Sequence, residues 1–320
     1  MAYEQLGVAG MTAGMKQTYS RMLLDRAKPN FIHAGHGLKD GIPRAGGRSL
    51  EWRRYERPGA ATTALTEGTP GAVTQLTISN VQVTINQYGA YSQYTDVLDL
   101  QNYDPFIASF ATMWGEQMGD TIDIVARNVM TAGTTVQYAS TAASRGALGG
   151  STSFRINYAE IREAAATLDV NDAKPLEDGK FLAFMHPYTK DEIFADSDIL
   201  TSFQNAYDRG PTNPLATGEV GDFYGIRWLM TSNARVFASQ GASGADVYAT
   251  LVFGRQFYGE VDYEAMGSRM IVKPVGSAGT SDPLDQLGTH GWKAAYNAAI
   301  LNQNWGVRIE HTVRLGAEGI

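Results

Sequence analysis

The sequence predicts an α+β protein in which an N-terminal arm and a charged hairpin extend from a core that contains one unusually long helix. Three observations predict this fold class. Apolar residues recur at helical spacing over 107–129, and residues 49–57 show a strand pattern with charges on both faces. After residue 153, short strand and helix patterns alternate. A chain of 320 residues with 43% hydrophobic residues can bury a sizeable core.

The composition excludes several classes of protein. The absence of cysteine rules out disulfides, thiolate metal sites and cysteine nucleophiles. A net charge of -7 argues against binding nucleic acid by neutralising its phosphates. No Lys or Arg precedes Lys16 and no apolar run reaches about 18 residues, so neither a signal peptide nor a membrane span is expected.

Residues 1–42 are expected to form an arm that contains one helix. Met15, Tyr19 and Met22 lie on a single apolar stripe, which another surface must cover. The glycine-rich residues that follow make rigid docking on the adjacent core difficult. Two interpretations remain open: a loosely held terminus, or an arm whose Met15, Tyr19 and Met22 contact a neighbouring subunit.

The hairpin follows the arm. Its first strand, 49–57, has the sequence SLEWRRYER, and the chain returns through 76–85. Because charge lies on both faces, neither face is expected to enter a dry core. One interpretation is an edge strand that uses charge to avoid aggregation, and the other is a clamp between subunits. The residues expected to make contacts between subunits are Trp52, Arg53, Arg54, Arg57 and Glu67.

The long helix is expected over 104–132. Asp104 is a suitable N-cap, Pro105 suits the first helical position, and Gly133 provides a stop. Its length of about 40 Å follows from about 1.5 Å per residue. Glu116, Asp120 and Asp123 are expected on a solvated face or at an interface rather than in a catalytic or metal site.

The second half of the chain predicts an α+β domain and a strand-rich C-terminal block. Helices are expected over 158–169 and from residue 188, directly after Pro187. The expected strands cover 181–185, 220–231, 247–253 and 270–275. Residues 292–313 are too rich in β-branched and aromatic residues for a helix, and they predict one long strand or a bent pair of strands.

The sequence contains no recognisable catalytic residues, metal site or cofactor motif. His33 and His36 have a spacing that could hold a metal, but no third ligand follows until Asp40, and a flexible glycine-rich loop is the favoured interpretation. No Walker sequence or nucleophile elbow occurs. A hydrolase triad dispersed along the chain stays open as the basis of an enzyme alternative.

Three segments carry a resemblance to a known family: ATTALTEGTPG (61–71), NQYGAYSQYTDVLDL (86–100) and GEQMGDTIDIVARNVMTAG (115–133). In this order they resemble the N4 gp56-like major capsid proteins of tailed bacteriophages. The resemblance implies the HK97-type coat fold. The implied parts are an N-terminal arm (1–42), an extended loop (43–80), a peripheral domain (81–152) with its spine helix (104–132), an axial domain (153–255) and a return to the peripheral domain (256–320).

The resemblance implies a protein without enzyme activity that assembles into pentamers and hexamers. These would close into an icosahedral shell around double-stranded DNA, without sequence-specific binding. Scaffolding, portal and decoration proteins are the implied partners, and the implied locations are the virion capsid and, during assembly, the host cytoplasm. The alternatives are a nanocompartment shell of the encapsulin type and a soluble α+β enzyme. The resemblance gives no basis for expecting a covalent cross-link between subunits, because no cross-linking motif aligns with this sequence.

Overall fold

The computed structural model of the chain describes residues 32–68, 71, 73–101, 106–176, 178–197, 199, 222–264, 268–277 and 282–314. The side chains of 99–101, 106–109 and 111 are not part of this description. The expected arm contacts Met15, Tyr19 and Met22 lie outside the described residues. The expected helix cap, Asp104 and Pro105, also lies outside them.

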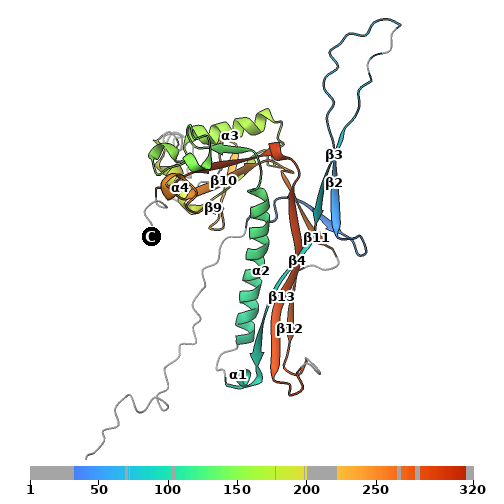
Figure 1. Cartoon of the computed structure of the whole chain (residues 1–320), viewed down its shortest axis with the longest axis vertical. Helices are drawn as coiled ribbons and strands as arrows, with labels where there is room; N and C mark the ends of the chain where they lie inside the picture. The colour runs from blue at the N-terminus through green and yellow to red at the C-terminus, as the bar shows by residue number, and fades with distance from the viewer. Residues whose placement is uncertain are drawn as a thin grey trace, which may run out of the picture.

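The described residues form two sheets and a separate two-stranded ribbon, arranged in an elongated molecule (Figure 1). The five-stranded sheet has β13 (Leu287–Ile300) at its centre. On one side β13 pairs with β4 (Asn86–Thr95), and on the other it pairs with β12 (Arg269–Lys273) and β11 (Tyr258–Tyr263). β1 (Leu38–Ile42) adds a parallel strand beyond β11.

Helix α2 (Phe106–Met130) lies along one face of this sheet and confirms the predicted long helix (Figure 1). Its 25 residues span about 38 Å at about 1.5 Å per residue. Trp292 of β13 donates its Nε1–H to Gln117 Oε1 at 2.9 Å, and His290 stacks on Phe110 with 5.1 Å between ring centroids. The short helix α1 (Asp96–Gln101) precedes α2.

A seven-stranded sheet forms the second body of the molecule. Its strands run in the order β5 (Val136–Tyr138), β14 (Gly306–His311), β10 (Val247–Phe253), β6 (Phe181–Met185), β8 (Ile226–Met230) and β7 (Asp222–Phe223), and β9 (Val236–Phe237) pairs with β10. Helices α3 (Tyr158–Val170) and α4 (Pro187–Ala195) pack against this sheet. Ile161, Leu168 and Ile193 are fully buried in its core.

Local signals placed both helices correctly. Asn157 caps α3 by accepting a hydrogen bond from Glu160 N at 3.0 Å, and Pro187 occupies the first turn of α4. His186 caps α4 through Nδ1, which accepts from Tyr188 N at 3.1 Å. The predicted strands 181–185 and 247–253 are β6 and β10.

Two predicted strand segments are each divided in the structure, and for 292–313 the pair of strands, one of the two expected alternatives, is found. The described part of the strand expected at 220–231 is a hairpin of β7 and β8, because Tyr224 and Gly225 adopt positive φ and turn the chain. Residues 292–313 divide between the C-terminal part of β13 and all of β14, which lie in different sheets. A one-turn helix at Gln303–Trp305 breaks the strand between them.

This division corrects the expectation that 256–320 returns to the sheet of the long helix. β14 pairs instead with β10 and β5 in the seven-stranded sheet. β5 also belongs to that sheet, although it falls in the segment expected to stay with the long helix. β14 is buried along its whole length, so a position between two strands suits it better than an edge.

The ribbon consists of β2 (Ser49–Tyr55) and β3 (Ile78–Thr84), as predicted. Its root, however, enters a core. Val83 and Ile85 are buried with Val261 and Ala295, and Trp52 packs against this cluster. The expectation that neither face of the ribbon enters a dry core is therefore wrong for the root. The reason is that Trp52 and Val83 lie on one face of the ribbon, and that face packs on the sheet.

Because His311, at the end of β14, is fully buried, we expect acid to destabilise the fold. Burial lowers its pKa to about 4, although its Nδ1 hydrogen bond with Thr312 O raises the pKa. The unfolded chain binds a proton below about pH 6.5 while the folded chain does so only near pH 4, so stability falls as the pH falls between these values. We expect the unfolding free energy to drop by about 2 kcal/mol between pH 7 and pH 5.

Urea denaturation of the unassembled subunit at the two pH values measures this loss. Burial also lowers the pKa values of His186 and His290, so the variant His311→Gln isolates the contribution of His311. The variant should lose clearly less stability on acidification than the parent chain. Equal losses in the two proteins would contradict the assignment.

Candidate assembly interface

The ribbon projects from the end of the sheet (Figure 1). It also exposes apolar side chains. Tyr55 is 75% exposed, Leu65 80%, Val73 92% and Leu76 73%. We call residues 57–77 the ribbon tip; the structure describes 57–68, 71 and 73–77 of it, all exposed. Large apolar side chains grouped on a projection indicate a surface that another molecule covers.

Two of the predicted interface arginines pair with carboxylates of their own strand segment. Arg53 Nε lies 3.0 Å from Glu51 Oε1, and Arg54 Nη2 lies 2.7 Å from Glu56 Oε1. Hydrogen bonds from Ser79 and from Arg54 lower the pKa of Glu56. Exposed pairs of this kind contribute little to stability, so they leave Arg53 and Arg54 available to a stronger partner.

The other predicted contacts divide into two groups. Arg57 and Glu67 are exposed and form no ion pair with any described residue. Trp52 instead packs within its own chain, because a Cβ added at Gly259 would lie 2.8 Å from its ring. The structure thus groups Arg53, Arg54 and Arg57 at the exposed part of the ribbon but places Trp52 at its root.

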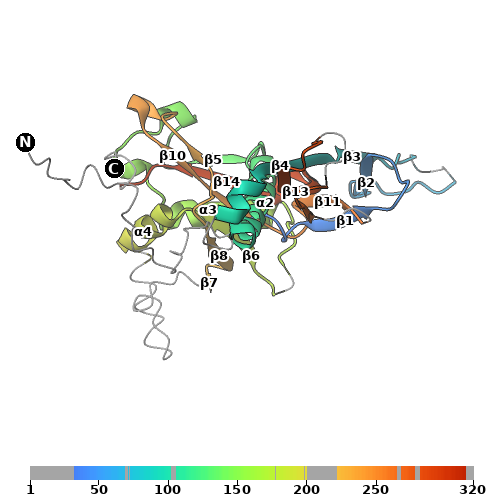
Figure 2. The ribbon, with the colours of Figure 1, turned by 90° about the horizontal axis from the view of Figure 1, so that it is seen from below.

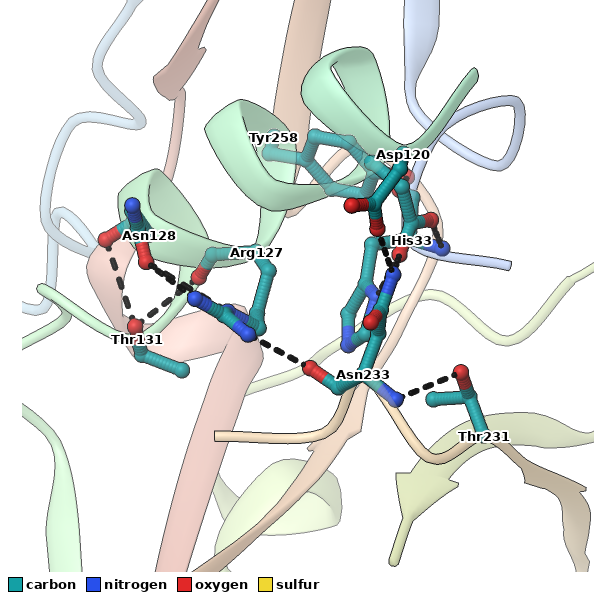
Figure 3. A network of polar contacts seen from close by, with 9 residues as sticks. His33, Asp120, Arg127, Asn128, Thr131, Thr231, Asn233 and Tyr258 are labelled. Atoms are coloured by element: carbon teal, nitrogen blue, oxygen red, sulfur yellow. Dashed lines mark hydrogen bonds and ion pairs between the residues drawn. The ribbon is translucent and has the colours of Figure 1, made fainter. Parts of the chain in front are cut away.

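A buried polar network that the sequence did not predict holds the beginning of the described chain (Figure 3). Asp123 of α2 accepts hydrogen bonds from His33 N at 2.7 Å and from Asn233 Nδ2 at 3.1 Å, and His33 Nδ1 lies 2.9 Å from its Oδ2. Tyr258 donates its hydroxyl to His33 O at 2.5 Å. The network ties the root of the arm to α2 and to both sheets.

Asp123 is fully buried, so its expected place on a solvated face or at an interface is wrong. The flexible glycine-rich loop expected around His33 is also corrected, because His33 is buried and held on both its backbone and its side chain. Burial alone would raise the pKa of Asp123, but hydrogen bonds from His33 and Asn233 hold it below its ordinary value. The carboxylate is therefore a structural anchor.

Removing this carboxylate should cost stability. We expect Asp123→Ala to lower the unfolding free energy by about 3 kcal/mol, because His33 and Asn233 then lose a buried acceptor. Asp120→Ala is the matched control on the same helix; it removes one bond, from Asn233 Nδ2 at 2.7 Å, at a less buried position. Thermal or urea unfolding measures both, and an equal effect of the two variants would contradict the anchor role.

A second buried carboxylate joins the end of α2 to the seven-stranded sheet. Glu310 accepts hydrogen bonds from Arg145 Nε at 2.8 Å, Arg145 Nη2 at 2.7 Å and Arg308 Nε at 2.7 Å. Arg308 also donates to Thr131 O and Gly133 O, just after α2. The hydrogen bonds to Glu310 raise the pKa of Arg145, so the charged form of this guanidinium is favoured.

The described residues offer no candidate metal-binding centre. They contain no group of three or more His, Asp or Glu side chains that could hold a metal ion. Within the same ranges, no helix is long and apolar enough to cross a membrane. The polar clusters around Asp123 and Glu310 are closed by their own hydrogen bonds.

Comparison with known proteins identifies the family. Residues 79–309 match the family described as Phage capsid protein, and the match covers more than half of the chain. The chain belongs to this family. No curated protein sequence matches it.

Solved structures agree on the fold of this phage capsid protein. The capsid of cyanophage P-SCSP1u is similar with a TM-score of 0.71 at 16% identity, over 94% of each chain. The capsid of cyanophage Pam1 gives 0.71 at 16% identity over 100% of each chain, and that of Ralstonia phage GP4 gives 0.71 at 14% identity over 94% of this chain and 96% of the other. The fold is the HK97-type coat fold. The phage capsid protein therefore has a structural role in forming a capsid.

Proposed function

We propose that this chain is the major capsid protein of a tailed bacteriophage, of the N4 gp56-like type, and that it has no enzyme activity. The observation that carries the proposal is the ribbon, which has no core of its own beyond its root and exposes Leu65, Val73 and Leu76. A monomer gains nothing from such a projection, whereas a shell subunit uses it to reach a neighbour.

The proposed assembly unit is a pentamer or hexamer, and these units close into an icosahedral head. In such a shell one chain occupies slightly different environments. The arm and the ribbon tip adapt to them while α2 and the two sheets keep their structure. The proposed domain names follow the sheets: the five-stranded sheet with α2 is the peripheral domain, and the seven-stranded sheet is the axial domain.

The proposed content of the head is double-stranded DNA, held without sequence-specific contacts. The net charge of -7 supports enclosure rather than tight binding, since an acidic wall does not retain phosphates. Assembly is proposed to occur in the host cytoplasm, with separate scaffolding, portal and decoration proteins as partners. Contacts between subunits are assigned to Arg53, Arg54, Arg57 and Glu67 of the ribbon and to Met15, Tyr19 and Met22 of the arm, while Trp52 acts through the ribbon root.

Negative-stain electron microscopy of the purified protein tests this function. We expect closed shells of uniform size, built from fivefold and sixfold units. A protein that stays a small oligomer under all assembly conditions and turns over a substrate would contradict the proposal. Particles isolated from the producing cell with enzyme cargo inside would instead identify a nanocompartment.

A further inference from the structure

β4 is an edge strand whose outer side has no strand beside it. All ten of its residues pair with β13, and no other described strand pairs with it. Figure 2 shows β4 at one edge of the five-stranded sheet and β1 at the other. An open edge of this length presents a row of backbone donors and acceptors.

The register identifies which backbone groups point outward. Asp96 N donates to Gln286 O at 3.0 Å, in continuation of the β4–β13 register, and hydrogen-bonded pairs alternate along antiparallel strands. Even-numbered residues of β4 therefore face β13 with their backbone groups, and odd-numbered residues face away. Between residues 86 and 94, the N–H and C=O groups that point outward belong to Gln87, Gly89, Tyr91 and Gln93. These four residues are exposed, and no described residue bonds to their backbone.

The sequence of β4 lacks the features that normally protect an edge. Its ten residues, NQYGAYSQYT, include no charged residue and no proline. The other edges of the same sheet are guarded: β1 carries Lys39 and Asp40, and β12 is short, with Arg269 and Lys273 at its ends. An uncharged edge of ten residues favours pairing with another strand, so we expect it to be covered in the assembled protein.

The ribbon tip contains a segment suited to this edge. Residues 73–76 form no backbone hydrogen bond with another described residue, and Thr77, the last residue of the tip, accepts through its carbonyl from Glu56 N at 2.9 Å. The sequence of 73–77, VTQLT, is uncharged and rich in residues that favour strands. The outgoing half of the tip, 60–66, contains three alanines and suits a strand less well.

The two segments cannot meet within one chain. Figure 1 shows the tip projecting beyond β2 and β3 at one end of the molecule, while β4 runs toward the other end. Ile85 alone separates β3 from β4, so bringing 73–77 back onto β4 would require the ribbon to open. We propose that residues 73–77 of a second copy add to the free edge of β4 as a further strand. This inference rests on the shell function proposed above.

Disulfide trapping tests the contact, and the absence of cysteine in the chain makes every product assignable. Gln87→Cys, Tyr91→Cys and Gln93→Cys are each combined with Thr74→Cys or Gln75→Cys. Paired residues on neighbouring strands lie about 5.5 Å apart between Cα atoms, within the range of a disulfide. After oxidation of purified shells, at least one double variant should give a ladder of linked chains on a non-reducing gel, and the single variants should not.

A backbone test uses the outward N–H of Gln93. Gln93→Pro removes this donor without touching the bonds to β13, and Gln93→Ala keeps it as the matched control. We expect the proline variant to keep the melting temperature of the subunit and to need about tenfold more protein for assembly than the alanine variant, as the loss of a hydrogen bond in a repeated contact predicts. Equal assembly of the two variants would overturn the proposal.

The outcomes of the trapping experiment separate this inference from the proposed function. If the parent chain forms shells but no double variant gives a ladder, the added strand is refuted and the capsid function stands. A ladder from Gln93→Cys with Thr18→Cys in the arm, and none with the tip, would also refute it in favour of the arm. If the parent chain forms no shells, the proposed function itself fails.

Discussion

The triple variant Arg53→Glu, Arg54→Glu, Arg57→Glu is expected to fold as a subunit and to fail in shell formation. All three side chains are exposed, and Arg54 Nη1 also donates to Leu301 O of its own chain at 3.5 Å. Reversing three charges places like charges opposite each other wherever the arginines contact carboxylates of a neighbour. We expect the yield of particles to fall on the order of tenfold or more, since each unfavourable contact recurs in every subunit.

Circular dichroism and electron microscopy of the same sample measure the two parts of this expectation. Arg57 forms no ion pair with a described residue of its own chain, so Arg57→Glu alone isolates the contact between subunits. Arg57→Lys is the matched control, because it keeps the charge. Intact shells from the triple variant would refute the clamp. If the triple variant unfolds, the arginines contribute to the stability of the subunit rather than to contacts between subunits.

Glu310→Ala is expected to lower the unfolding free energy of the subunit by about 3–5 kcal/mol. Glu310 is fully buried and joins Arg145 to Arg308, so its loss leaves two guanidinium groups without their carboxylate. The Arg145 guanidinium also lies 3.4 Å from the centre of the Phe237 ring and is thus held in place when its partner is gone. Its unbalanced charge therefore stays in a partly buried site.

Urea denaturation at pH 7 gives the size of this effect. Glu310→Gln keeps the shape and one acceptor oxygen but removes the charge, so it should fall between the parent and the alanine variant. We also expect the connection between α2 and the seven-stranded sheet to loosen, which faster hydrogen exchange at Thr131 and Gly133 would report. A loss below about 1 kcal/mol in Glu310→Ala would show that the cluster contributes little.

Elements whose signals are local could be predicted from the sequence. The apolar stripe predicted α2, and the cap at Asn157 and the proline at 187 agree with the beginnings of α3 and α4. The ribbon was predicted from its composition, because a strand with charges on both faces is expected to lie at the surface or at an interface rather than inside a core. Each of these inferences depends on residues within one or two turns of each other.

What the sequence did not predict depends on partners far apart in the chain. Asp123 looked like part of a solvated face because its partner His33 lies 90 residues away and its other partner, Asn233, 110 residues away. The separation of β13 and β14 into two sheets depends on which strands lie beside each of them. No local pattern contains that information.

The pairing of the ribbon arginines was available in the sequence. Side chains two residues apart share a face of a strand, so Glu51 lies beside Arg53, and Glu56 beside Arg54. The same spacing joins Arg308 to Glu310 in β14. Arg57 has Tyr55 and Gly59 at this spacing and no carboxylate, so the sequence identifies it as the ribbon arginine without a local partner.

The 14-residue strand β13 has a mechanical consequence for the shell. It binds β4, β12 and β11 in one continuous ladder and carries the root of the ribbon through Ala295. This ladder, with α2 packed along it, makes the elongated half of the subunit rigid. Differences in curvature across a closed shell are then expected to be accommodated at residues 301–305, where this rigid half ends, and at the contacts between subunits.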